Sequence, residues 1–411
     1  MKMSMPAKLG LLGALYFSQG LPFGFFSQAL PVLLRKQGVS LGQIGLSYLL
    51  VLPWALKFLW APLIDRRFLP AFGRRKSWIV PLQLASVVVL AGLASSLANS
   101  MTVLMVAILL LNLLAATQDI ATDGLAIDML APSERGIANG LQVAGYRVGM
   151  IVGGGVLLIL HDRLGAARTF LAMAALTAVA TMPIAASRER RHVLPPAPNV
   201  SGSTPHFLRR PGAWRLLSLV IVYKAGDAFA TGMLRPFLAD AGLTLTDIGW
   251  LLGTVGFVAG LVGALAGGVL VNAVGRRAAL TAFGLLQAAA VAGYAYVALG
   301  KPTPPTLYMV CAAEHFAGGM ATAALFTCMM DWCSSDASAT DYTVQASAVV
   351  IATAVAAAAA GFSAQALGYF GHFCLSTLFA LGAVIAVRLL FPSPSVVQML
   401  RAQPPEAVPC A

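Results

Sequence analysis

Residues Leu109–Asp128, LLLNLLAATQDIATDGLAID, have the length and apolar composition of a membrane-spanning helix, yet they include Asp119 and Asp123. A carboxylate near the centre of such a helix costs about 2.5–3.5 kcal/mol on insertion scales, so it must face a bundle interior, a partner charge or water. At about 100° per residue, one stripe of the helix holds Asn112, Ala116, Asp119 and Asp123. We therefore expect a polar pathway through the membrane; the alternative is that both carboxylates cap or cross-link neighbouring helices.

The composition places the whole chain in a membrane. Of its 411 residues, 59% are hydrophobic and 10% are charged, and the mean hydropathy is +0.82. These values exclude a soluble globular domain. The N-terminus runs directly into an apolar segment that is too long and too polar for a cleaved signal peptide. The five cysteines lack CxxC spacing and predict neither a disulfide framework nor a metal site.

At about 20 apolar residues per span, the chain has room for about twelve spans. We predict them at Leu9–Leu34, Leu41–Ile64, Trp78–Ala98, Met101–Leu130, Gly136–Leu160, Ala166–Ala186, Trp214–Ala239, Leu245–Val274, Ala278–Leu299, Thr306–Trp332, Tyr342–Leu367 and Phe370–Phe391. The segment between the sixth and seventh spans is rich in Arg and Pro and cannot cross a membrane, so we interpret it as a polar linker.

The two halves of the chain repeat each other. Three separated matches share a spacing of 202 to 204 residues: Gly38–Gly45 with Gly242–Gly249, Gly73-Arg74-Arg75 with Gly275-Arg276-Arg277, and Gln142 with Gln345. The repeat predicts an all-α membrane protein with the major-facilitator fold, in which twelve transmembrane helices form two six-helix pseudo-repeated halves. The predicted halves are residues 1–187 and 214–392, with a cytoplasmic linker at 188–213 and a cytoplasmic tail at 393–411.

The basic residues predict an orientation. Most of the 27 Lys and Arg residues fall in loops on one side once both termini are placed in the cytoplasm. This bias explains the net charge of +12 without a nucleic-acid partner. We expect a multi-pass membrane protein with both termini in the cytoplasm, with membrane lipids and a small-molecule substrate as its partners, and a monomeric state.

The loop after the second span carries a motif, WAPLIDRRFLPAFGRRKSW at Trp60–Trp78. It resembles the signature loop of the major facilitator superfamily, Gly-x3-Asp-Arg/Lys-x-Gly-Arg-Arg/Lys, with Ala61 replacing the leading Gly and five extra residues before Gly73. The longer loop is similar to that of the muropeptide-permease (AmpG-like) branch, and the acetyl-CoA transporter family has a similar loop. Further matches to the branch are YFSQGLP at Tyr16–Pro22, KFLWAPLIDR at Lys57–Arg66, TQDIATDGLAIDML at Thr117–Leu130 and ERGIANGLQVAGYRVGM at Glu134–Met150.

Chain length suggests a cargo within this branch. Muropeptide permeases are usually longer, with extra spans, so a chain of about twelve spans is more similar to the siderophore-uptake permeases, the rhizobactin and pyochelin transporters. That resemblance implies import of a siderophore, pyochelin-like and ferric, across the bacterial inner membrane by alternating access. Muropeptide import and acyl-CoA transport by the same branch are the alternatives.

The motif loop is expected to gate the transporter and not to bind substrate. Asp65 can accept hydrogen bonds from a neighbouring helix N-terminus, and the arginines can bind carboxylates and lipid phosphates. The predicted gating residues are Asp65, Arg66, Gly73, Arg74 and Arg75.

Polar and aromatic groups inside the spans predict a substrate cavity, lined by Tyr16, Gln19, Phe23, Gln142, Tyr146, Arg147, Lys224 and Thr231. Lys224 can meet an acidic group of the substrate or simply pair with Asp227 one turn away. Arg147 can balance Asp119 or Asp123, whereas Lys57 is expected to be structural. Aromatic rings mixed with amides suit an amphipathic ligand such as an aryl siderophore.

The chain has no GxxxxGK[ST] motif for ATP, so transport is expected to use the proton gradient. The predicted proton carriers are Asp119, Asp123, Asp227 and Glu314, with His315 as a relay. For Glu314 the alternative is a hydrogen bond between helices. No second His follows His315 at the spacing of a zinc site, so we expect no metal and no cofactor, and iron only inside a bound siderophore.

Two other classes of protein, a membrane enzyme and a receptor, fit the sequence less well than a transporter. A membrane enzyme needs an acid–base constellation that His161-Asp162 and His315 do not supply, and its chemistry does not require repeated halves. A non-transporting receptor does not require paired gating loops. Both patterns favour a transporter.

Overall fold

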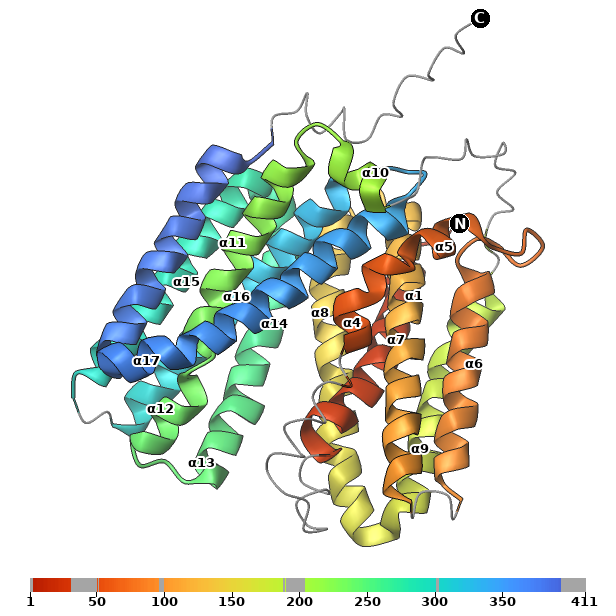
Figure 1. Ribbon diagram of the computed structural model, residues 1–411, viewed down its shortest axis with the longest axis horizontal. Helices are drawn as coiled ribbons and strands as arrows, with labels where there is room; N and C mark the ends of the chain where they lie inside the picture. Colours follow the sequence, from red (N-terminus) through yellow and green to blue (C-terminus); the bar gives the residue numbers. More distant parts are fainter. Residues whose placement is uncertain are drawn as a thin grey trace, which may run out of the picture. The chain divides into compact units, whose positions relative to one another are not determined.

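The computed structural model describes residues 3–30, 50, 52–95, 100–187, 189, 204–300 and 303–392. The described residues form helices and their connections in two units (Figure 1). Unit 1 comprises residues 1–130, 141–204 and 335–343, and unit 2 comprises residues 131–140, 205–334 and 344–411. Each unit therefore includes a short segment that comes from the other half of the sequence.

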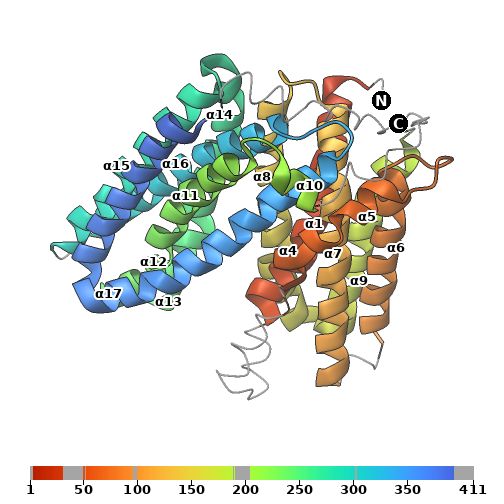
Figure 2. The same ribbon diagram turned by 45° about the horizontal axis from the view of Figure 1, so that its top comes forward.

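The helices of unit 1 are α1 (Met5–Gly24, continued by a π-helix at Phe25–Ala29), α4 (Leu52–Leu56), a 3-10 turn at Lys57–Leu59, α5 (Ala61–Arg66), α6 (Lys76–Leu93), α7 (Met101–Met129), α8 from Leu141 onward (whole helix Arg135–Ile151), a π-helix at Val152–Val156, and α9 (Leu157–Ala186). Helix α6 packs against α7 and α9, as both views show (Figures 1 and 2). These helices match the predicted spans closely, except the second.

The second span is broken, whereas the sequence predicted one continuous helix at Leu41–Ile64. In its described part, α4 ends at Leu56, a single 3-10 turn follows, and α5 begins at Ala61. Pro62 lacks the N–H that a continuous helix needs and lies in the first turn of α5, and Trp60, the residue before this helix, has φ −112° and ψ 0°. The 3-10 turn places Lys57 at the interruption.

Unit 2 contains α10 (Thr204–Arg209, from residue 205), α11 (Ala213–Thr231), α12 (Leu234–Asp240), α13 (Leu245–Trp250), a π-helix at Leu251–Gly256, α14 (Phe257–Val274), α15 (Arg276–Ala298), α16 (Pro304–Asp331) and α17 (Ser338–Leu390, from residue 344). Helices α14 and α15 both pack against α16. The seventh predicted span is divided between α11 and α12, and the eighth continues from α13 through the π-helix into α14.

Two glycines divide long helices into separate spans. Helix α17 has 53 residues, about 80 Å at 1.5 Å per residue, far more than a bilayer needs. It breaks at Gly368 (φ 66°), and α9 breaks at Gly165 (φ 82°). Both angles lie in the region that favours glycine, and the two positions are 203 residues apart, the spacing of the sequence repeat.

The helices account for twelve spans. In the described part of the chain, nine helices are long and apolar enough to cross a membrane. Helix α17 supplies two of the spans because it breaks at Gly368. The interrupted second span and α8 with its π-helix complete the set. The all-α, twelve-helix fold predicted from the sequence is confirmed.

Close helix packing in unit 1 depends on two glycines four residues apart, Gly149 and Gly153. A Cβ atom added at Gly149 would lie 2.3 Å from the carbonyl oxygen of Phe17, and one at Gly153 would lie 2.0 Å from that of Leu21. Both distances are far below contact range, so α1 approaches this face of the fifth span as closely as backbones can.

The polar stripe of α7 is turned into unit 1. Asp119 and Asp123 are 8% and 2% exposed, whereas Leu109 and Leu113 are more than 40% exposed. The leucine side has the composition of a lipid-facing surface, and the carboxylates face the bundle interior that their insertion cost requires.

Candidate functional site

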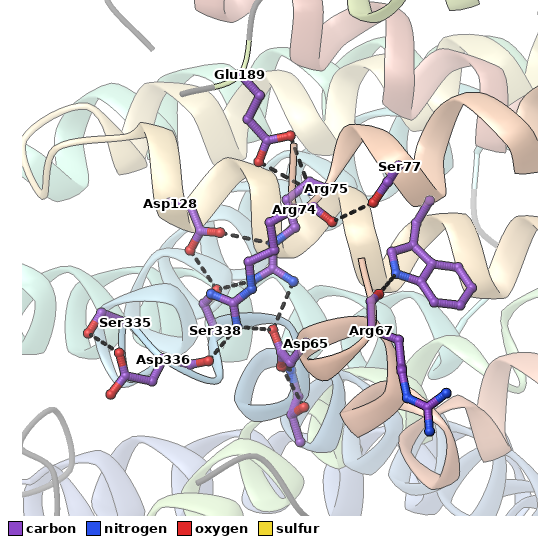
Figure 3. A network of polar contacts seen from close by, with 12 residues as sticks. Asp65, Arg67, Arg74, Arg75, Ser77, Asp128, Glu189, Ser335, Asp336 and Ser338 are labelled. Atoms are coloured by element: carbon purple, nitrogen blue, oxygen red, sulfur yellow. Dashed lines mark hydrogen bonds and ion pairs between the residues drawn. The ribbon is translucent and has the colours of Figure 1, made fainter. Parts of the chain in front are cut away.

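The motif loop forms a buried polar network inside unit 1 (Figure 3). At its centre is Asp65, near the end of α5 and 5% exposed. Its Oδ1 accepts hydrogen bonds from Arg74 (3.0 Å) and Arg75 (2.8 Å). Its Oδ2 accepts bonds from the backbone N–H (2.7 Å) and the hydroxyl (2.6 Å) of Thr340, in the first turn of helix α17. Asp65 therefore meets a helix N-terminus, as predicted.

Arg75 extends the network to α7. Its Nε donates to Asp128 at 2.9 Å, and its Nη2 donates to the hydroxyl of Ser338 at 2.7 Å. Ser338 in turn donates to Asp128 at 2.6 Å. Burial alone would lower the pKa of Arg75, but the charges of Asp128 and Asp65 outweigh it and raise that pKa above its ordinary value. The guanidinium is a permanent positive centre that holds two carboxylates.

Arg74, next to Arg75, binds one carboxylate, whereas Arg75 binds two. Burial and the neighbouring charge of Arg75 lower the pKa of Arg74, against the opposing effect of Asp65. Arg74 also donates to the backbone carbonyl of Asp336. Arg66, the fifth predicted gating residue, is exposed, so the structure shows the loop divided between a buried core and a solvated edge.

Glu189 fixes the start of α6, a contact that the sequence did not indicate. Its carboxylate accepts hydrogen bonds from the backbone N–H groups of Arg75 (3.1 Å) and Lys76 (2.9 Å). These are N–H groups at a helix start, where a carboxylate is favourable. Gly73 has φ 101°, and an added Cβ there would lie 2.5 Å from Glu189. The glycine is therefore required both by the backbone angle and by the approach of this carboxylate.

Unit 2 contains a second copy of the loop with altered chemistry. Asp331 accepts hydrogen bonds from Arg276 Nε (2.8 Å) and Arg135 Nη1 (2.7 Å). Asn272 stands three residues before Gly275, where the superfamily motif has an aspartate, and its Oδ1 accepts a bond from Arg276 at 2.7 Å. Gly275 has φ 84°, matching Gly73. The predicted repeat therefore extends to the backbone conformation of both loops.

Within the spans of unit 1, two carboxylates of α7 have different partners. Asp119 forms an ion pair and hydrogen bond with Lys57. Asp123, one turn further, accepts bonds from Tyr16 (2.8 Å) and Gln142 (3.3 Å). The sequence-based interpretation gave Lys57 a structural role and offered Arg147 as the balancing charge. The structure pairs Asp119 with Lys57, and Arg147 is partly exposed.

Three aromatic rings lie beside this cluster. The ring centroids of Phe23 and Trp54 are 5.7 Å apart, those of Phe23 and Tyr146 are also 5.7 Å apart, and Lys57 Nζ lies 5.6 Å from the centroid of Trp54. Trp54 is buried and donates to Asn112 at 3.0 Å, whereas Phe23 and Tyr146 are partly exposed. Aromatic rings next to a buried charged group are common in sites for amphipathic ligands.

Unit 2 contains its own ion pair, which is partly buried. Lys224 donates to Asp227 at 2.6 Å and to Thr322 at 3.0 Å, and Gln287 donates to Asp227 at 2.5 Å. Thr231 donates to the backbone carbonyl of Asp227 at 3.0 Å. The pairing of Lys224 with Asp227 that we considered as the structural alternative is thus present, together with contacts to two further helices.

Glu314 and His315 lie together on α16. Glu314 is 2% exposed, and its Oε2 lies 2.8 Å from Nδ1 of His315. The same Nδ1 lies 3.0 Å from the backbone carbonyl of Cys311, one turn earlier. The described contacts of this pair are therefore mainly local to α16 and do not show the hydrogen bond between helices.

Gln19 is the remaining predicted cavity residue. It is fully buried, and within the described residues neither of its amide atoms has a hydrogen-bond partner. The sequence missed Lys57, Trp54 and Glu189 as parts of these networks. For Lys57 a signal was present, because a cation at that depth needs a carboxylate partner.

A family model described as acetyl-coenzyme A transporter 1 matches residues 8–103 and 95–176. The anhydromuropeptide permease of Escherichia coli (strain K12) is 31% identical over 385 residues, covering 91% of this chain and 78% of the relative. The chain belongs to the anhydromuropeptide permease family. A Rickettsia felis relative of this permease, named "Putative transporter AmpG 4", is 29% identical over 388 residues, covering 90% of the chain and 93% of the relative.

Solved structures agree with the permease fold. The structure of FucP, a major facilitator superfamily transporter in its outward conformation, aligns with 94% of the chain at a TM-score of 0.69 and 14% identity, and 99% of FucP is covered. This likeness shows the fold alone. Together with its permease relatives, this likeness makes the chain a membrane transporter with the major-facilitator fold, multi-pass in the bacterial inner membrane.

Proposed function

We propose that this permease imports anhydromuropeptides across the bacterial inner membrane by proton-coupled alternating access. The observation that carries the proposal is 31% identity to an anhydromuropeptide permease over 91% of the chain. The comparisons favour this cargo, which the sequence gave as an alternative, over the siderophore that it gave first.

The siderophore expectation depended on chain length, and length no longer separates the two cargoes. The chain covers 78% of the Escherichia coli permease but 93% of the Rickettsia felis relative whose name also refers to AmpG. Members of the muropeptide branch can therefore be as short as this chain.

The buried side chains suit the chemistry of the cargo. An anhydromuropeptide combines pyranose rings with a peptide that carries carboxylates. Lys57 and Lys224 can bind carboxylates, and the rings of Phe23, Trp54 and Tyr146 can stack on sugar faces. Acyl-CoA, the other cargo in this branch, carries phosphates and an adenine instead.

Asp119, Asp123, Asp227 and Glu314, with His315 beside it, are the groups that we propose to carry the coupled proton. Each carboxylate is buried or nearly so inside a span, where an ionisable side chain is a functional candidate by default. The positive-inside bias supports cytoplasmic termini, and we propose a monomer that works without cofactor or metal. That the clusters of both units line one cavity stays a prediction.

Ligand-induced thermal stabilisation tests the cargo directly. The purified chain in detergent is melted with an anhydromuropeptide, with ferric pyochelin and with acetyl-CoA, each at matched concentrations. We expect the melting temperature to rise with the anhydromuropeptide alone, because a ligand that binds the folded state stabilises it by RT ln(1 + [L]/Kd). A rise with ferric pyochelin alone would return the function to siderophore import.

A further inference from the structure

We propose that the Lys57–Asp119 ion pair is a carboxylate subsite of the anhydromuropeptide site, in which a proton on Asp119 releases Lys57 to bind a carboxylate of the cargo. This inference rests on the proposed function and deepens it. The geometry that supports it is the tertiary pairing of Lys57, in the interruption of the second span, with Asp119 on α7.

Lys57 has capacity for a second partner. Its ammonium group carries three N–H donors, and among the described residues Asp119 is the one side chain that accepts a hydrogen bond from it. Lys57 is 2% exposed, so the remaining donors do not reach bulk water. By contrast, Lys224 binds both Asp227 and Thr322, and Asp227 is held by Gln287 as well.

Further unused hydrogen-bonding capacity lies next to the pair. Gln142 is 8% exposed and donates to Asp123, one turn from Asp119, while its Oε1 has no partner within the described residues. A buried amide oxygen left without a partner costs about 1–3 kcal/mol. A ligand with N–H and O–H groups, such as an N-acetylated sugar or a peptide, can satisfy this oxygen.

The exchange conserves charge. In the resting pair the ammonium of Lys57 neutralises the carboxylate of Asp119. When a proton and a cargo carboxylate enter together, the proton forms an O–H bond on Asp119 and Lys57 neutralises the cargo. The number of charges inside the unit stays the same, which matters because each unpaired buried charge costs several kcal/mol. Cargo binding and proton binding are therefore coupled, and the coupling is reciprocal.

The other titratable groups that act on the pair leave this exchange intact. Asp123 lies on α7, interacts with both Lys57 and Asp119, and is held by the hydroxyl of Tyr16 on α1. Tyr146 on α8 faces Asp119, and Tyr342 on α17 acts on Tyr16. Asp123 thus has hydroxyl and amide donors of its own, whereas Lys57 forms the ion pair with Asp119.

The test measures the affinity of the purified full chain for an anhydromuropeptide between pH 5.5 and pH 8.5, in the wild type and in Asp119→Asn. The same ligand with its carboxyl groups amidated is measured in parallel. We expect wild-type affinity to fall by about tenfold per pH unit where one proton is taken up with the ligand. Asp119→Asn is expected to bind with an affinity that changes less than twofold over the range, and amidation is expected to weaken wild-type binding at least tenfold.

Two variants complete the experiment. Asp240→Asn is the control. It changes an exposed carboxylate, which accepts a hydrogen bond from Tyr369, and it should keep the wild-type pH slope. Lys57→Met with Asp119→Asn removes both charges and should bind free and amidated ligand equally weakly.

The outcomes separate the two proposals. If the wild type binds the anhydromuropeptide and Asp119→Asn, shown to be folded by its melting curve, keeps the pH slope, the subsite is refuted while the proposed function stands. The subsite is also refuted, and the proposed function again stands, if the double variant still binds the free ligand more tightly than the amidated ligand. If the wild type does not bind the anhydromuropeptide at any pH, the proposed function fails and the subsite fails with it.

Discussion

Asp65 and Thr340 are 275 residues apart in the sequence, yet the carboxylate of Asp65 accepts hydrogen bonds from both the backbone N–H and the hydroxyl of Thr340. The same carboxylate binds the guanidinium groups of Arg74 and Arg75. One buried side chain therefore joins the loop after the second span to the start of the eleventh. The gating role that the sequence suggested for this loop stays a prediction, and this contact is the part of the network that such a gate would have to break.

Replacement of Asp65 by Ala should lower stability strongly, because it leaves two buried arginines without this carboxylate. Breaking a buried ion pair by removing one partner costs about 3–5 kcal/mol. Thr340→Val removes the hydroxyl bond alone and should cost about 1 kcal/mol. Melting temperatures of the two purified variants in detergent show which of them loses more stability. Equal melting temperatures for the two variants would contradict the central position of Asp65.

Gly73 and Gly275 form a matched pair for a test of the loop. Both have positive φ, so substitution by Ala strains the backbone of each by about 1–3 kcal/mol. At Gly73 the new Cβ also meets Glu189, whereas nothing lies within 4 Å of a Cβ at Gly275. Gly73→Ala should therefore melt at a lower temperature than Gly275→Ala. Glu189→Gly in the Gly73→Ala background removes every Glu189 atom that the new Cβ meets and should recover part of that difference, and no recovery would show that Glu189 is not the cause.

Asp331 holds two arginines in unit 2, Arg135 and Arg276. Asp331→Asn keeps the shape but leaves two like charges near one another, so we expect a loss of several kcal/mol, of the size measured when one partner of a buried pair is removed. Asp240→Asn, at an exposed carboxylate, is the control and should change stability by about 1 kcal/mol or less. A loss no greater than that of the control would mean that the network contributes little.

A double-mutant cycle on Lys57 and Asp119 separates a structural role from a functional one. Each single variant, Lys57→Met or Asp119→Asn, disrupts a buried pair, and each should cost about 3–5 kcal/mol because it leaves the other buried charge unpaired. The double variant should regain most of the stability, because replacing both charges is often nearly neutral. It should remain unable to accumulate cargo, and recovery of both stability and uptake would assign the pair to structure alone.

The sequence could predict the spans because hydropathy and length depend on the local segment. The repeat spacing also anticipated the matched glycines at Gly73 and Gly275, and the structure adds a second matched pair, Gly165 and Gly368. The break in the second span was missed, although Pro62 was visible, because a proline can also be accommodated within a continuous membrane helix. Gly38–Gly45, the first part of the repeat, lies outside the described residues.

The residues of the candidate site could be predicted from the sequence, but which side chain pairs with which could not. Burial cost identified Asp119, Asp123 and Asp227 from the sequence. The choice of Lys57 as the partner of Asp119 depends on where a broken helix delivers its side chain, and no local pattern encodes that position. Likewise, Glu189 reaches the start of α6 from a segment more than a hundred residues later.

Uptake of radiolabelled anhydromuropeptide into sealed, right-side-out membrane vesicles tests the central claim most directly. Vesicles that contain the chain should accumulate the ligand above its external concentration while a pH gradient is imposed, and they should fall to equilibration when the gradient is collapsed. Excess ferric pyochelin should not compete. Uptake no greater than in vesicles without the chain, together with accumulation of ferric pyochelin, would contradict the account.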